Sequence, residues 1–140
     1  MGLRMTFLWI FLFLVVAVLA YIRLAPHDPA RWHQAAPQAP LGETVGEGSY
    51  VWRADLGDQG SETFARLDQI IRATPRTRRF AGSVAEGQAT YITRSKVMGF
   101  PDYTTVTFAN GDLEVFARLR FGKSDLGVNT RRVKGWLAQL

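Results

Sequence analysis

The pattern of hydrophobic and polar positions divides the chain into an apolar first segment and a longer remainder of mixed polarity. Residues 7–22, FLWIFLFLVVAVLAYI, carry no charged side chain. With residues 5, 6 and 24 they approach the ~20 residues that a helix needs to cross a bilayer. Trp9 and Tyr21 stand near the ends of the segment, where aromatic rings favour the headgroup region. We therefore expect a membrane anchor over residues 1–24 that contacts the bilayer through residues 5–24.

A cleavable signal peptide is the alternative interpretation of this segment, because Val18-Leu19-Ala20 would permit cleavage after Ala20. The apolar run exceeds the usual ~7–15 residues of a signal peptide, which favours an uncleaved anchor. Under either interpretation, the rest of the chain is exported across the membrane. Arg4 precedes the span and Arg23 follows it, so charge hardly discriminates between the orientations. We expect the N-terminus in the cytoplasm and the C-terminal domain on the periplasmic or extracytoplasmic side of an inner membrane.

The next segment, residues 25–48, is rich in proline, alanine and glycine. Repeated proline discourages helix, so the composition predicts an extended juxtamembrane linker. Trp32, between Arg31 and His33, would let this linker touch the headgroup region, although a plain tether explains it at least as well. The folded domain is then expected to occupy residues 49–140.

Alternating and helical patterns follow one another through that domain. Strands are expected at residues 49–55, 77–84, 89–97, 103–109 and 113–121, and helices at 61–73 and 129–140, with Asn129 as the cap of the second helix. Asn110-Gly111 predicts a two-residue hairpin turn that pairs residue 108 with 113, 106 with 115 and 104 with 117. The order β-α-β-β-β-β-α predicts an α+β fold, a small antiparallel sheet with helices packed on one face.

Residues 117–124, ARLRFGKS, satisfy a loose form of the nucleotide-binding P-loop pattern. The residues RLRF continue the strand alternation, however, and backbone groups that pair with a neighbouring strand cannot also form a phosphate-binding loop. The chain after Ser124 turns instead of entering a helix at once. We therefore expect no nucleotide and no other cofactor.

Three stretches resemble an uncharacterised bacterial family of membrane-anchored proteins called domain of unknown function 1499. They are LAPHDPARWH (24–33), YITRSKVMGFPDYTTV (91–106) and RLRFGKSDLGVNTRRVKGWLAQL (118–140). The most specific parts are two turn motifs, with Gly99, Phe100, Pro101 and Asp102 in the first and Gly122 to Asn129, including Gly127, in the second. The resemblance implies an envelope-associated protein and supplies no activity. Serines often stand between the arginines of the last strand in that family, whereas this chain has Ala117 and Leu119.

The turn motifs and the strands beside them carry the candidate chemistry. Asp102 and Asp125 are candidate general acids or bases, and Ser124 is a candidate nucleophile or hydrogen-bond donor. The candidate anion-binding residues are Arg94, Lys96, Arg118, Arg120 and Lys123. Each also has a plain structural interpretation, because aspartates fix turns and alternating arginines form solvated strand faces.

Composition restricts the function further. Both histidines, His27 and His33, lie in the expected linker and the chain has no cysteine, so a zinc site lacks ligands, and a Ser-His-Asp arrangement would need the linker to fold back. A formal net charge of +5 favours acidic partners, and export argues against nucleic acid. We therefore prefer a binding or structural module whose basic sheet face engages an anionic lipid, glycan or protein. The alternative is a small hydrolase or transferase that uses Asp102 and Asp125.

Overall fold

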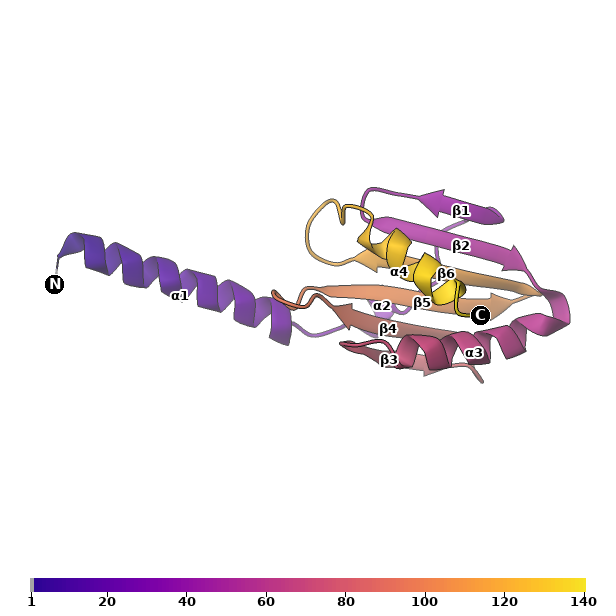
Figure 1. Cartoon of the computed structure of the whole chain (residues 1–140). Coiled ribbons are helices and arrows are strands. Elements are labelled where there is room, and N and C mark those ends of the chain that lie inside the picture. The colour runs from indigo at the N-terminus through magenta and orange to yellow at the C-terminus, as the bar shows by residue number, and fades with distance from the viewer. Residues whose placement is uncertain (1) are drawn as a thin grey trace.

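The computed structural model describes residues 2–140. Helix α1, Leu3–Leu24, projects from one end of a folded body (Figure 1). Its most apolar 18-residue window has a mean hydropathy of 2.7 and is only 6% buried. The helix is therefore long and apolar enough to cross a membrane, and the folded body leaves most of its side chains uncovered.

The body is built on one antiparallel sheet with the strand order β1-β2-β6-β5-β4-β3. The strands are β1 Gly42–Val45, β2 Ser49–Asp55, β3 Thr77–Ser83, β4 Gln88–Arg94, β5 Pro101–Ala109 and β6 Asp112–Leu119. The β5–β6 hairpin has the expected register, and Asn110 and Gly111 both have the positive φ that a type I′ turn requires. The loops after β4 and β6 lie at the end of the sheet where α1 leaves the body (Figure 1).

Two helices cover one face of this sheet. The helix α3, Gly60–Arg72, follows the short 3-10 turn η1, Gly57–Gln59, and α4 spans Val128–Leu137. Their buried apolar side chains are Phe64, Leu67, Ile71, Val133 and Trp136, which pack on Tyr50, Tyr91, Val106, Leu113 and Val115 of the sheet. The predicted α+β architecture, with helices on one side of an antiparallel sheet, is confirmed.

The N-terminus of α4 differs from the expectation that Asn129 caps it. The cap is Gly127, with φ +79°, and Asn129 is a fully buried residue of the first turn. The carboxylate of Asp125 accepts the Asn129 backbone N–H at 3.0 Å and its side-chain Nδ2 at 2.8 Å. Because an aspartate already satisfies this helix end, the Asn129 side chain is free to pack inward.

The opposite face of the sheet is covered by residues 25–39, which include the short helix α2, Pro29–Trp32, behind the sheet in Figure 1. The Trp32 ring stacks on Tyr103 of β5 with a centroid distance of 4.3 Å and an angle of 10°. Farther along, His33 Nδ1 lies 2.7 Å from the Thr90 hydroxyl, and the Ala36 N–H donates to Glu114 at 2.9 Å.

The structure therefore differs from the expected linker over residues 25–48 and from a domain that starts near residue 49. Residues 25–39 belong to the folded body, and residues 42–45 form the additional edge strand β1. The physical reason lies in the prolines, which limit helix to the single turn of α2 and leave backbone carbonyls available. Arginine side chains of the sheet bind those carbonyls, as described below.

Candidate functional site

The two turn motifs meet at the end of the sheet nearest α1. Residues from both line a pocket of about 380 Å³, whose walls are Ser95, Phe100, Asp102, Leu119, Phe121, Gly122, Ser124, Asp125, Val128 and Arg132. Gly99, Gly122 and Gly127 all have positive φ, which explains why glycine stands at these turns, and Pro101 starts β5. The predicted residues Asp102, Ser124 and Asp125 thus share one pocket.

Asp125 has a structural task in this pocket. Its carboxylate accepts the Gly127 N–H at 2.9 Å in addition to the two bonds from Asn129. Burial acts to raise the pKa of Asp125, but the hydrogen bonds from Asn129 and Gly127 outweigh it and hold that pKa below its usual value. A carboxylate engaged in this way closes the start of α4 and is poorly placed to accept a substrate proton.

Asp102 is likewise engaged. Its carboxylate pairs with Arg132 of α4 at 3.1 Å, and the same guanidinium donates to Asn129 Oδ1 at 2.8 Å. Burial raises the pKa of Asp102, and the attraction of Arg132 opposes that rise. Nearby, Ser124 Oγ accepts the Leu126 N–H at 3.3 Å. The network joins β5 to the start of α4.

The predicted anion-binding arginines converge on the outer face of the sheet, but that face is not open. Arg118 is only 8% exposed. Its guanidinium donates to the Thr105 hydroxyl at 2.8 Å and to the backbone carbonyl of Trp32. Burial lowers the pKa of Arg118 to about 10, which still leaves it charged at neutral pH. Arg118 therefore fastens residues 25–39 to the sheet instead of facing a ligand.

Arg94 and Arg120 hold the junction between α1 and the body. Arg94 donates to the carbonyls of Arg23 at 3.1 Å and Gly99 at 2.9 Å. Arg120 donates to the Pro26 carbonyl and to the Tyr103 hydroxyl, both at 3.0 Å. These partners are neutral, so the positive charges of both guanidiniums remain uncompensated.

His27 lies among these charges. Its Nδ1 is 2.5 Å from the Tyr103 hydroxyl, and its Nε2 is 3.2 Å from Arg94 Nη2. Burial, followed by repulsion from Arg94, Arg120 and Arg78, lowers the pKa of His27 to about 4. The imidazole is therefore neutral at physiological pH, and repulsion from the surrounding arginines adds to the effect of burial.

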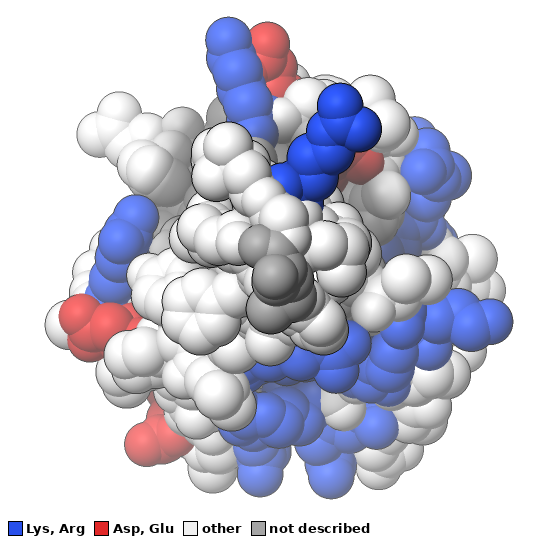
Figure 2. Space-filling model, turned by 90° about the vertical axis from the view of Figure 1, so that its left-hand side faces the viewer, with Lys and Arg blue, Asp and Glu red and all other residues white. Residues whose placement is uncertain are grey.

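Two further arginines stand beside this junction on β3 and just before it. Arg76, Arg78 and Arg94 line a pocket of about 270 Å³ together with Thr77 and Ile92. We call Arg23, Arg76, Arg78, Arg94 and Arg120 the arginine cluster. Among the ion pairs of residues 2–140, none involves a member of this cluster. Figure 2, which looks along α1 onto this end, shows a continuous group of basic side chains on one side of the helix.

Sequence reasoning placed Arg94 and Arg120 in the site but missed Arg23, Arg76, Arg78 and His27 as site residues. Two features of the sequence could have pointed to these arginines. Arg23 directly follows the apolar span, and residues 76 and 78 alternate at the start of β3. Lys96 and Lys123 are exposed in the loops after β4 and β6, at the same end of the body. The described residues include no group of three or more His, Cys, Asp or Glu side chains that could hold a metal ion.

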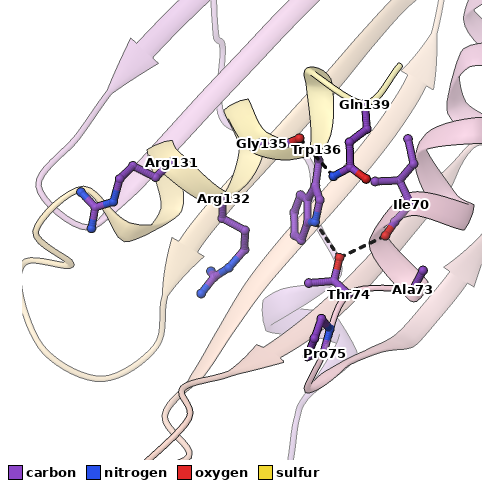
Figure 3. A pocket seen from close by; sticks show the side chains of 9 residues that line it. All are labelled: Ile70, Ala73, Thr74, Pro75, Arg131, Arg132, Gly135, Trp136 and Gln139. Carbon is purple, nitrogen blue, oxygen red and sulfur yellow. Dashed lines mark hydrogen bonds between the residues drawn. The ribbon is translucent and has the colours of Figure 1, made fainter.

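A separate hollow of about 410 Å³ lies between the end of α3 and α4 (Figure 3). Trp136 Nε1 donates to the Thr74 hydroxyl at 2.8 Å, and that hydroxyl donates to the Ile70 carbonyl at 3.0 Å. These bonds tie the two helices together. Arg132 also lines the hollow but pairs with Asp102, so the polar groups here serve internal contacts.

The fold and this site define a small α+β domain, closed on both faces of its sheet, behind an apolar N-terminal helix and with a cluster of arginines where the two meet. Residues 22–140 match the family described as "Protein of unknown function (DUF1499)", and the chain belongs to that family. The match covers residues 25–39 as well as the sheet and its helices. None of the curated proteins compared with this chain matches it.

Proposed function

We propose that the protein is a membrane-anchored envelope module, with its folded body on the extracytoplasmic side, that binds the phosphate groups of anionic lipids through the arginine cluster. The observation that carries this proposal is the gathering of five guanidiniums around the point where α1 leaves the body. A phosphate accepts several charge-assisted hydrogen bonds from guanidiniums, and the pocket lined by Arg76, Arg78 and Arg94 is large enough for a headgroup.

The position of the cluster favours lipid over a glycan or a protein. Arg23 is the second-last residue of α1. If α1 crosses the bilayer, the cluster lies at the level of the headgroups, where each basic side chain contributes about 1 kcal/mol to the attraction of an anionic surface. The outer sheet face, by contrast, is occupied by residues 25–39 and offers a partner little access.

The hydrolase or transferase alternative has less support in the geometry. Asp102 and Asp125 both line the 380 Å³ pocket, but Asp102 pairs with Arg132 and Asp125 accepts backbone N–H groups at the start of α4. The described side chains around Ser124 include no histidine that lies within hydrogen-bonding distance of it. We therefore keep the binding module as the proposed function.

The proposal is tested by counting lipids bound to the full chain in detergent micelles by native mass spectrometry. The probes are phosphatidylglycerol and phosphatidylcholine. The variant Arg76→Asn/Arg78→Gln removes two charges of the cluster, and asparagine tolerates the positive φ of 56° at position 76. We expect this variant to bind phosphatidylglycerol about 30-fold more weakly, from about 1 kcal/mol for each arginine.

A matched control removes two positive charges elsewhere. Arg66→Gln/Lys134→Gln lies on α3 and α4, and Lys134 only pairs with the exposed Glu43. This control should retain phosphatidylglycerol as the unchanged protein does. Equal loss in both double variants, or no preference of the unchanged protein for phosphatidylglycerol, would contradict the proposal.

A further inference from the structure

The loop between β4 and β5, residues 95–100, has a defined shape. The Ser95 N–H donates to the Phe100 carbonyl at 3.0 Å, and the Phe100 N–H donates to Ser95 Oγ at 2.9 Å. Gly99 takes a positive φ of 73° at its turn. These closures make the loop a short, fixed projection from the end of the sheet.

This projection lies along α1. Arg23 Nη2 donates to the Val97 carbonyl at 3.2 Å, and Arg94 holds the Gly99 carbonyl at 2.9 Å. A groove of about 340 Å³ runs between the loop and the helix. It is lined by Met98 and Phe100 on the loop side and by Phe11, Leu14, Val15, Val18, Leu19 and Ile22 on α1.

The helix residues of this groove set its depth. From Ile22 back to Phe11 the helix rises about 16 Å, at 1.5 Å per residue. Half of the hydrocarbon core of a bilayer measures about 15 Å. If α1 crosses the membrane, a groove with these walls extends into the outer leaflet, and the tip of the loop lies beside acyl chains or at their boundary with the headgroups.

The side chains at the tip suit that location. Val97 is 79% exposed and Met98 is 41% exposed, so both present apolar surface to the surroundings of the body. Lys96 precedes them and has the reach to extend toward phosphate. The Tyr21 ring of α1 also meets Phe121 of the loop after β6, at a centroid distance of 6.0 Å.

We propose that the β4–β5 loop is a membrane wedge: Val97 and Met98 enter the outer leaflet, and lipid acyl chains fill the groove between the loop and α1. The inference rests on the anchoring part of the proposed function, but not on headgroup binding by the arginine cluster. The wedge fixes the body against the bilayer, so that the arginine cluster faces the headgroups instead of swinging on a tether.

Because the chain has no cysteine, single cysteines can carry an environment-sensitive fluorophore. The experiment places Val97→Cys, Ala85→Cys or Val16→Cys in the full chain in phosphatidylcholine nanodiscs with and without nitroxide-labelled acyl chains. Ala85 is exposed in the turn after β3, at the other end of the sheet, and Val16 lies in the middle of α1. We expect blue-shifted, nitroxide-quenched emission at positions 97 and 16, and neither effect at position 85.

The outcomes separate this inference from the proposed function. If the fluorophore at position 97 shows neither a blue shift nor quenching while the one at position 16 is quenched, the wedge is overturned and the proposed headgroup binding is unaffected. Absence of quenching at position 16 would overturn the anchor and the wedge with it. Quenching at position 97 in pure phosphatidylcholine would support the wedge even if the arginine cluster showed no preference for anionic lipid.

Discussion

At the residue scale, His27 is the most informative side chain in the protein. It lies half-buried against Tyr103 of the sheet, shortly after the end of α1, and its partners Arg94 and Arg120 carry charges that no described carboxylate neutralises. Its pKa of about 4 follows from burial and from this repulsion. An anion bound at the cluster would reduce the local positive potential, so His27 is a built-in reporter of the charge environment.

This pKa leads to a prediction about acid stability. The unfolded chain binds a proton at His27 below a pKa of about 6.5, whereas the folded chain does so only below about 4. The unfolded state thus binds more protons between these values, and stability falls as the pH decreases from 6.5 to 4. After allowance for solvent screening we expect a loss of about 1–2 kcal/mol from this residue.

The measurement is chemical unfolding of the full chain in detergent at several pH values, compared with the variant His27→Asn. Removal of the imidazole lowers stability at neutral pH through the lost contact with Tyr103, but it also removes the proton-linked loss. The gap between the two proteins should therefore narrow as the pH falls below 6. A gap that stays constant from pH 7 to pH 4 would show that the His27 pKa is not depressed.

At the element scale, strands β2 to β6 and helices α3 and α4 could be predicted from the sequence, because burial of one face gives each a regular spacing of apolar residues. The edge strand β1 has no buried residue and gave no such pattern. The hairpin register follows from Asn110-Gly111 together with the alternation on either side. Residues 25–39 gave no such signal. They pack through isolated contacts, such as Trp32 on Tyr103, and through carbonyls that bind arginines, and neither interaction has a sequence period.

The site was partly predictable for the same reason. The turn motifs pointed to Asp102 and Asp125, and alternation placed Arg94, Arg118 and Arg120 on one face. The roles of these residues could not be predicted, because they depend on contacts between distant parts of the chain. Arg118, for example, donates to the carbonyl of Trp32, which lies 86 positions earlier and belongs to the segment that covers it. Pairing of Asp102 with Arg132 likewise depends on how α4 docks.

The role of residues 25–39 can be measured directly. Trp32→Ala should lower the free energy of unfolding of the full chain by about 2 kcal/mol, because it removes a stacked aromatic pair and part of the apolar cover of the sheet. Trp32→Phe retains an aromatic ring over Tyr103 and should lose less. Chemical denaturation followed by circular dichroism gives both values. If Trp32→Ala is as stable as the unchanged protein, this segment does not close the outer face.

At the scale of the whole molecule, three features lie at one end of the body: the exit of α1, the arginine cluster and the loop with Val97 and Met98 at its tip. The opposite end carries the turn after β3 and the hairpin turn at Asn110-Gly111. Part of the net positive charge of +5 is therefore concentrated at one end of the body, where a group of basic side chains lies beside the apolar helix (Figures 1 and 2). Every functional proposal above requires that this end face the outer surface of a membrane.

The most direct test of that requirement is the labelling of single cysteines in bacterial cells that express the full chain and whose outer membrane has been permeabilised. A membrane-impermeant maleimide should label Ala85→Cys, in the turn after β3, before lysis. It should label Gly2→Cys, ahead of α1, only after lysis. The reverse pattern, or equal labelling of both positions in unlysed cells, would contradict a helix that carries this domain across the membrane to its outer side.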